Sequence, residues 1–250
     1  MSNTSLRHLE QLIASKWEHI LEQPQALQFA NSLMGKDRRV YAIYLTQVYH
    51  YAFHTPRNQA LVAVNPENRD IHYMQFCLEH ALEETGHELM ALHDLRSMGL
   101  KFNDPHTEMP PALPPTQLLI AYLYRIAQQG NPVQRLGYSF WAETSYGYIR
   151  EFMDDLGRNM QLDKKQMTFF YNHSVIDDKH AKDVEKILLH VCKTEADWEA
   201  VGNSAMITLE LTFQILRAVV DEYEKLVREE PSDFLIMNSL EQVQDFAAQN

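Results

Sequence analysis

Apolar residues recur at intervals of three, four and seven along most of the chain, which is the spacing that places side chains on one face of an α-helix. Polar and charged residues fill the positions between them, as in amphipathic helices that bury one face. Glycine and proline residues mark the expected helix ends. The pattern predicts helices at about 4–22, 25–35, 36–54, 70–100, 116–129, 131–157, a segment that carries 172–190, and 194–229.

Several of these helices begin at a recognisable capping signal. The Thr55-Pro56 pair predicts that the chain starts a new helix after His54, because proline is favoured in the first turn and disfavoured in the interior. Further N-terminal caps are expected at Asn131 before Pro132, at Asp163, and at Thr194 with Asp197. The proline-rich segment 101–115, KFNDPHTEMPPALPP, is the one clear loop; it is either a cover over a site or an ordinary surface connection.

The composition supports a helical bundle. The chain has 250 residues, 45% of them hydrophobic, and only 8 glycines, which favours long helices over a turn-rich β structure. Phosphate-binding glycine loops, Gly-x-Ser-x-Gly elbows and internal repeats are all absent from the sequence. We therefore expect an all-α, single-domain bundle of about seven to nine helices in residues 1–230, followed by a C-terminal tail or short helix in 231–250.

The charge and the cysteines exclude several classes of protein. With 34 acidic against 22 basic residues the net charge is −12, which argues against nucleic acid or an anionic membrane as a partner. The sequence lacks both a signal-peptide pattern and an apolar run of about 18 residues. Cys77 and Cys192 do not form a zinc-binding or redox pattern and suit a reducing compartment. We expect a cytoplasmic protein.

The segment NHSVIDDKHAKDVEKILLH, residues 172–190, carries three potential metal ligands on one helical face. His173, Asp177 and His180 lie at offsets of zero, four and seven residues. Apolar residues flank this face, whereas lysines such as Lys179 and Lys182 lie on the other side. The three residues are either part of a solvated helix face or one wall of a buried metal site, and the apolar flanks favour the second interpretation.

A second segment, EHALEETGHELM, has the same spacing at His80, Glu84 and His87. Glu84-x-x-His87 repeats the carboxylate-x-x-His pattern of Asp177 and His180, which lets two side chains of one helix reach a common ion. Glu83 is the alternative to Glu84, and the shared i, i+3 spacing favours Glu84. We interpret His80, like His93 and His190, as a surface residue or a residue that supports a ligand.

Glu143 is an isolated acid among aromatic residues in GYSFWAETSYGYIR, and a buried carboxylate is unfavourable unless a charge meets it. Together the two stripes and this acid predict a metal site that binds two iron ions, with manganese as the alternative metal. Three imidazoles and three carboxylates indicate oxygen chemistry rather than a structural zinc. The candidate metal ligands are Glu84, His87, Glu143, His173, Asp177 and His180.

This ligand set resembles that of the heme-oxygenase-like dimetal oxidases, whose fold is shared with thiaminase II and the pyrroloquinoline quinone synthase. The resemblance covers roughly residues 10–225, including YLTQVYHYAFHTPR at 44–57. It implies a heme-oxygenase-like fold and a non-heme di-iron centre that holds Fe(II) and reacts with O2. It also implies a small organic substrate, either an amino acid, a fatty acid or an amine, and we expect a homodimer.

Thiaminase II, which shares this fold, provides the alternative interpretation of the sequence. Thiaminase II has Gln-Asp-Tyr where this chain has Gln47, Val48 and Tyr49, so the acid that holds the pyrimidine is missing. The alternative function is nevertheless a metal-free, thiaminase-II-like hydrolase or a small-molecule-binding protein on the same fold. Tyr44, Tyr49 and Tyr138 either line a substrate pocket or pack in the core.

Overall fold

The computed structural model describes residues 2–240, and it describes the side chains of all of these except 2, 146–148 and 173–178. Within this part of the chain every regular element is helical. Eleven α-helices and two short 3-10 helices follow one another: α1 (Ser2–Leu21), α2 (Pro24–Met34), α3 (Arg38–Ala63), α4 (Ile71–Glu83), α5 (Glu88–Ser97), α6 (Pro105–Glu108), α7 (Pro114–Gln128), η1 (Pro132–Gln134), α8 (Arg135–Thr144), α9 (Tyr146–Met160), α10 (Thr168–Val191), α11 (Glu195–Val227) and η2 (Leu235–Ser239).

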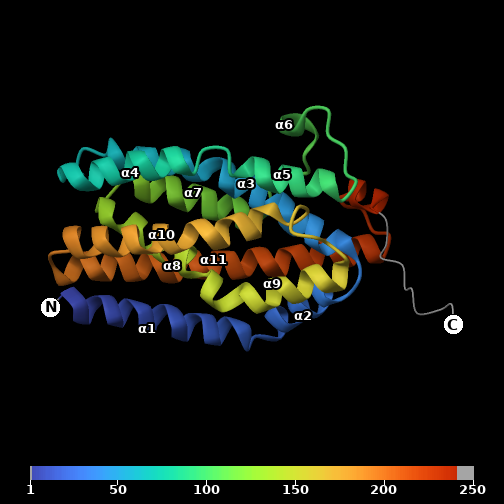
Figure 1. Ribbon diagram of the computed structural model, residues 1–250, viewed down its shortest axis with the longest axis horizontal. Coiled ribbons are helices and arrows are strands. Elements are labelled where there is room, and N and C mark those ends of the chain that lie inside the picture. Colours follow the sequence, from blue (N-terminus) through green and yellow to red (C-terminus); the bar gives the residue numbers. More distant parts are fainter. Residues whose placement is uncertain (1, 241–250) are drawn as a thin grey trace.

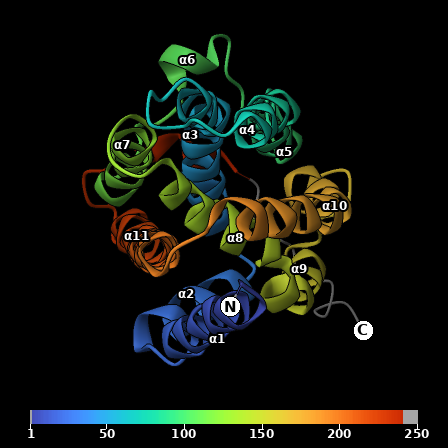
Figure 2. The same ribbon diagram turned by 90° about the vertical axis from the view of Figure 1, so that its left-hand side faces the viewer.

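The helices lie in three layers along the long axis of the molecule (Figure 1). α3 packs with α4, α5 and α7 in one layer, while α8 packs between α10 and α11 in the next. α1, α2 and α9 form the third layer. Seen along the bundle, α8 lies in the middle of the molecule (Figure 2), so a polar side chain on α8 is surrounded by other helices.

Close packing of α8 on α11 depends on Gly137. A Cβ atom at this position would lie 2.1 Å from the backbone oxygen of Val201 and 2.8 Å from the backbone nitrogen of Ala205. Both contacts are with backbone and cannot relax by a change of rotamer. The missing side chain therefore lets the central helix α8 approach the long helix α11 directly.

The sequence predicted one helix at 70–100, and this prediction is wrong because the chain breaks between α4 and α5. Gly86 has a φ of +93°, in the left-handed region that favours glycine. Glu84 caps the end of α4 and His87 immediately precedes α5. The Glu84-x-x-His87 motif therefore spans a turn and not a continuous helix.

The helix predicted at 131–157 is also divided, at Ser145. The Thr144 hydroxyl donates to the carbonyl of Phe140 at 2.8 Å, and the Ser145 hydroxyl donates to that of Ala142 at 2.7 Å. Such hydroxyl groups compete for helical carbonyls and bend helices. The expected start of this region at Asn131 is confirmed, since its side chain accepts from the backbone nitrogen of Val133.

Conversely, the helix break predicted at Thr55-Pro56 is wrong, because α3 continues through Pro56. Proline removes one backbone donor from a helix interior. Neighbouring side chains bind carbonyls of the same turn: Thr55 donates to Tyr51 at 3.2 Å and Asn58 donates to His54 at 2.7 Å. The long packed surface of α3 against α4, α5 and α7 favours the continuous helix.

The start of α10 is fixed by a residue from another helix. The sequence predicted Asp163 as its cap, but the helix begins at Thr168, and Asp163 caps only the preceding turn. Asp94 of α5 accepts instead from the backbone nitrogens of Thr168 and Phe169, at 2.9 and 3.0 Å, and from the Thr168 hydroxyl at 2.7 Å. α10 is therefore positioned by a tertiary contact.

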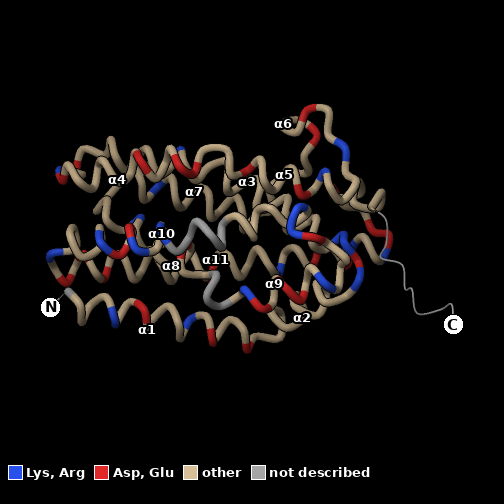
Figure 3. Tube along the Cα trace, viewed as in Figure 1, with Lys and Arg blue, Asp and Glu red and all other residues tan. Residues whose placement is uncertain are grey.

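The expected all-α, single-domain class is confirmed, and the eleven α-helices exceed the predicted seven to nine because of the two breaks and of α6, which lies within the predicted loop. Residues beyond 230 also join the core, with Phe234 and Met237 buried. Acidic and basic positions are interspersed along the helices (Figure 3). Of the helices in the described part of the chain, none combines the length and apolar character needed to cross a membrane.

Candidate metal centre

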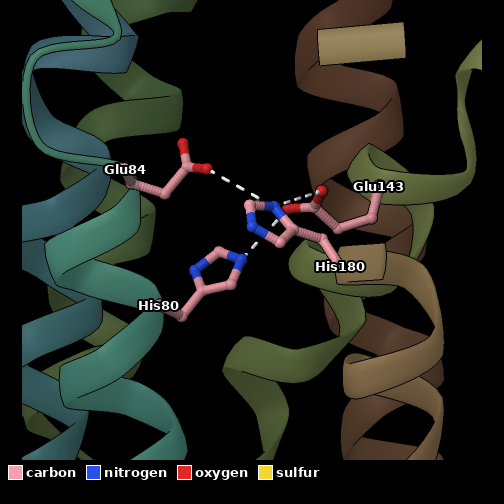
Figure 4. A group of neighbouring side chains, drawn as sticks. All are labelled: His80, Glu84, Glu143 and His180. Atoms are coloured by element: carbon pink, nitrogen blue, oxygen red, sulfur yellow. Dashed lines mark hydrogen bonds and ion pairs between the residues drawn. The ribbon is translucent and has the colours of Figure 1, made fainter. Parts of the chain in front are cut away.

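Four side chains from three helices converge near the middle of the bundle. His80 and Glu84 come from α4 and its C-terminal cap, Glu143 from the last turn of α8, and His180 from α10 (Figure 4). Each offers one ligand atom, and these atoms all lie within 4.8 Å of one another. We call these four residues the central cluster.

Glu143 and His180 are in the middle of this arrangement. The two oxygens of Glu143 face different imidazoles: Oε1 lies 3.2 Å from His80 Nε2, and Oε2 lies 3.3 Å from His180 Nδ1. His180 Nδ1 also lies 3.7 Å from Glu84 Oε1, so its ring stands between the two carboxylates (Figure 4). One carboxylate and one imidazole thus connect α4, α8 and α10.

His87 and Glu83 contact the central cluster from outside it. His87 Nδ1 lies 3.1 Å from Glu84 Oε2, so the two residues meet across the turn at Gly86. Glu83 lies closer to solvent, with its side chain 43% exposed, and its carboxylate contacts His180 Nε2 at 3.0 Å and Lys179 at 2.6 Å. Of the two adjacent acids, Glu84 is therefore the buried one.

The charges of the cluster shift the pKa values of its members. Burial alone would raise the pKa of Glu143, but hydrogen bonds with His180 and His80 lower it to about 2. Burial also opposes the shift at Glu84, where the hydrogen bond with His87 holds the pKa below its usual range. Although burial disfavours the charged form of His180, its hydrogen bond to Glu143 and the nearby acids raise its pKa to about 9.

The donor set fits a divalent metal ion. His80 Nδ1 is buried and lacks a hydrogen bond to any described residue, while His180 Nδ1 lies between two carboxylates, 3.3 Å from Glu143 and 3.7 Å from Glu84. Ligand atoms about 2.1 Å from one divalent ion lie at most about 4.2 Å apart, so the 4.8 Å spread needs only small side-chain movements. Imidazole and carboxylate together suit iron, and a metal ion would replace the proton that the two acids hold on His180.

The structure brings part of the predicted ligand set together. Glu84, Glu143 and His180 belong to the central cluster, and His87 contacts it through Glu84. The side chains of His173 and Asp177 lie outside the described residues, although their backbone belongs to α10, so their role stays a prediction.

His80 is the residue that the sequence interpretation left out of the ligand set. It is 4% exposed and contacts Glu143 directly. The available signal was its position four residues before Glu84, on the same helical face.

Two hollows of different character adjoin the central cluster. The first, of about 340 Å³, opens between α4 and α10; we call it the polar cleft, and its described lining includes His80, Glu83, Lys179, His180 and Asp183. The second, of about 150 Å³, lies between α3, α8 and α10 and reaches Glu84 and Glu143; we call it the aromatic cavity. Its described lining includes the rings of Trp17, Tyr44, Tyr138, Trp141, Phe169 and Phe170.

Of the three tyrosines that were candidates for a pocket, Tyr44 and Tyr138 thus line the aromatic cavity. Tyr49 is buried but does not belong to its described lining. The loop at 101–115 also contributes no described residue to either hollow. It is held instead against α3, where Gln47 accepts from the backbone nitrogen of Leu113 at 2.8 Å.

Comparison with known sequences identifies a family. Residues 42–213, more than half of the chain, match the model of a family described as iron-containing redox enzyme. The matched segment includes the whole central cluster. No curated protein matches the chain.

Solved structures show the same fold. A domain of unknown function with a heme oxygenase-like fold from Shewanella denitrificans OS217 is 42% identical, with a TM-score of 0.85 over 91% of this chain and 97% of that one. A TenA homologue from P. horikoshii OT3 is 15% identical, with a TM-score of 0.69 over 87% of this chain and 98% of that one. A TenA homologue from Pyrococcus furiosus is similar at 15% identity, with a TM-score of 0.65 over 86% and 99%. These likenesses confirm the expected heme-oxygenase-like fold.

Proposed function

Because the chain belongs to the family of iron-containing redox enzymes, we propose that it is an O2-dependent oxidase or oxygenase with a non-heme di-iron centre and a small organic substrate. The observation that carries this proposal is the central cluster itself. Two buried imidazoles, the buried Glu84 and the 10% exposed side chain of Glu143 converge there from three helices. Among the described contacts, no lysine or arginine forms an ion pair with either carboxylate. Buried acids in this setting require a cation.

We assign the binding of the metal to His80, Glu84, Glu143 and His180, with His87 beside Glu84 and with His173 and Asp177 as the predicted further ligands on α10. Two bound ferrous ions would supply the electrons and the open coordination positions for the reduction of O2. Glu143 suits a site for two ions because its two oxygens face two different imidazoles.

The surrounding residues determine how such a site operates. Burial of Glu84 and His180, at 7% and 2% exposure, keeps bulk water away from the reacting atoms. His180 holds a proton at neutral pH, since its pKa is raised to about 9, and a bound metal ion would take the place of this proton. The aromatic cavity borders Glu84 and Glu143 and can hold a substrate beside them.

The alternative function, a metal-free thiaminase-II-like hydrolase, needs a reactive nucleophile. Cys77 and Cys192 are both buried, and burial raises the pKa of each thiol to about 12. Thiols in this state are poor nucleophiles at neutral pH. Gln47, at the start of the segment that differs from thiaminase II, holds the 101–115 loop, and the adjacent Val48 is fully buried. These contacts favour the oxidase.

The test is anaerobic loading with Fe(II), followed by measurement of iron content and of O2 consumption. We expect about two irons per chain and O2 uptake in the wild type. The His80→Ala and His180→Ala variants should lose both, because each removes a buried imidazole of the central cluster.

The matched control is His72→Ala, which removes an exposed imidazole two turns before His80 on α4. This control should retain iron and O2 uptake. A wild-type protein without bound iron would contradict the proposal and favour a metal-free binding protein, and iron retained by His180→Ala would contradict the assignment of that ligand.

A further inference from the structure

We infer that the aromatic cavity binds an uncharged organic molecule of about the size of one benzene ring. The inference deepens the proposed function, on which it rests for the identification of this molecule as the substrate. The binding itself follows from the walls, the size and the charges of the cavity.

Aromatic rings packed on one another form much of the wall. Tyr44 stacks on Phe170 with ring centroids 6.1 Å apart, and Trp141 meets Trp17 and Tyr138 edge-on at 6.2 and 5.4 Å. Rings that pack on one another lose little further side-chain entropy when a guest arrives. The cavity is therefore a preformed site for a flat or compact apolar molecule.

Its size limits the guest. The volume of about 150 Å³ equals that of an engineered apolar cavity known to bind benzene or xenon. Ala52, 6% exposed on α3, and Leu119, 1% exposed on α7, bound the cavity with little room for displacement. A long acyl chain or a fused ring system would extend beyond this volume.

Most polar groups of the described lining already have partners within the protein. The Trp141 indole donates to Thr208 at 2.7 Å, the Thr55 hydroxyl to the carbonyl of Tyr51, and the Ser145 hydroxyl to that of Ala142. A guest therefore gains little from hydrogen-bonding groups placed against these residues. Burial raises the pKa of Tyr138 to about 12, so its phenol also stays uncharged.

The charges exclude an anionic guest. Glu84 and Glu143 are the charged residues of the described lining, which contains neither lysine nor arginine. Every lysine and arginine of the chain lies among the residues whose side chains are described. Arg135 packs against the Tyr138 ring, 4.6 Å from its centroid, but binds Asn58 and does not line the cavity. A guest carboxylate would thus meet two acids and no basic side chain.

A cationic guest is also disfavoured. Both oxygens of Glu143 already contact imidazole nitrogens, 3.2 Å from His80 and 3.3 Å from His180. The oxygens of Glu84 contact His87 at 3.1 Å and His180 at 3.7 Å. A guest ammonium group would have to displace one of these imidazoles, which leaves the neutral molecule as the preferred guest.

The experiment is isothermal titration of the metal-free, full-length chain with four probes: toluene, benzoate, benzylammonium and naphthalene. We expect saturable binding of about one toluene per chain, and at least about tenfold weaker binding, or about 1.4 kcal/mol, for the other three. Equal or tighter binding of benzoate or benzylammonium would overturn the uncharged class. Equal binding of naphthalene would overturn the size limit, and absence of saturable toluene binding would overturn the site.

Ala52→Leu fills the aromatic cavity and should weaken toluene binding at least about tenfold, while Ala121→Leu, the same change at an exposed position of α7, should leave it unchanged. Unchanged toluene binding by a folded Ala52→Leu variant would contradict the location. A wild-type crystal under xenon pressure tests the location without any substitution: xenon density should lie in the aromatic cavity, and density only elsewhere would contradict it.

Iron content, measured on the same preparation, separates this inference from the proposed function. Toluene binding without iron binding would overturn the di-iron function and leave the guest class standing. Iron binding without toluene binding would overturn the guest class alone.

Discussion

The acids on the two sides of the central cluster differ in what compensates their charge. On the polar cleft, Glu83 pairs with Lys179 at 2.6 Å and Asp183 pairs with Lys186 at 2.9 Å. On the aromatic cavity, the ion-pair contacts of Glu84 and Glu143 with other described residues are all with histidines. The exposed acids are satisfied by lysines and solvent, whereas the buried acids need a proton or a metal ion nearby.

This difference distinguishes the acids that we propose as metal ligands from the acids of the polar cleft. Surface ion pairs contribute little to stability, about 0–1 kcal/mol each, so their loss should be tolerated. A buried carboxylate without a basic partner is unfavourable by several kcal/mol and is retained only where a cation compensates it. We therefore expect substitutions on the aromatic side to abolish metal binding and equivalent substitutions on the cleft side to modify it.

The largest effect is expected for Glu143→Gln. The amide keeps the shape but loses the charge that faces His80 and His180, so iron affinity should fall by more than the roughly 10- to 100-fold typical of residues that only support a ligand. Competition with a fluorescent chelator measures the affinity. Asp183→Asn, the matched change in the polar cleft, should change the iron affinity by no more than about twofold. Equal losses of affinity in both variants would contradict the distinction between the acids of the polar cleft and those of the aromatic cavity.

A second effect is the pH dependence of metal binding. A metal ion must displace the proton of His180, whose pKa is raised to about 9, so the apparent Mn(II) affinity should rise by up to about tenfold per pH unit between pH 6.5 and 8.5. The stability of the metal-free protein changes in the opposite direction, because it falls as the pH rises. The raised pKa stabilises the fold fully below about pH 6.5, and this contribution is lost as pH rises toward 9.

Free Mn(II), measured by electron paramagnetic resonance, gives the affinity, and urea unfolding gives the stability. An affinity that does not change with pH would show that His180 is already neutral in the metal-free protein.

Residues of α10 line both the polar cleft and the aromatic cavity, and Asp94 binds the first residues of that helix. Asp94→Ala removes the acceptor for two backbone nitrogens and one hydroxyl, so the free energy of unfolding should fall by about 2–3 kcal/mol. Asp163→Ala removes only the cap of an exposed turn and should lower it by less than about 1 kcal/mol. Urea denaturation measures both variants. Similar losses would mean that the contacts of Asp94 with α10 stabilise the fold no more than the local cap at Asp163.

The smallest effect is expected for Glu83→Gln. Its carboxylate contacts His180 Nε2 at 3.0 Å and orients the ring from the cleft, so iron affinity should fall by about tenfold. Glu79→Gln, an exposed cleft acid on α4, should have no effect on the affinity. A loss for Glu83→Gln as large as that for Glu143→Gln would make Glu83 a ligand.

The sequence predicted the helical class and several helix ends because those depend on local patterns. The Thr194-Asp197 capping box opens α11 as expected. The break at Gly86 and the bend at Ser145 could not be predicted, since a glycine or a hydroxyl within a helical pattern is compatible with either outcome. The cap of α10 by Asp94 joins residues 74 positions apart and has no local signal.

The candidate site was predictable as far as helical spacing reaches. Spacing on one face predicted that Glu84 and His180 point inward. The aromatic surroundings of Glu143 predicted that its side chain is shielded from solvent, and it is 10% exposed. Spacing alone could not decide that His80 joins them, because that depends on the distance between α4 and α8. The character of the two hollows depends on three packed layers, and no single segment of sequence specifies it.

The most direct test of the account is anomalous diffraction at the iron absorption edge from crystals loaded anaerobically with Fe(II). We predict an iron peak among His80, Glu84, Glu143 and His180, which would be lost in crystals of Glu143→Gln. An iron peak confined to the polar cleft beside Glu79 and Asp183, or absence of any peak in iron-loaded wild-type crystals, would contradict it.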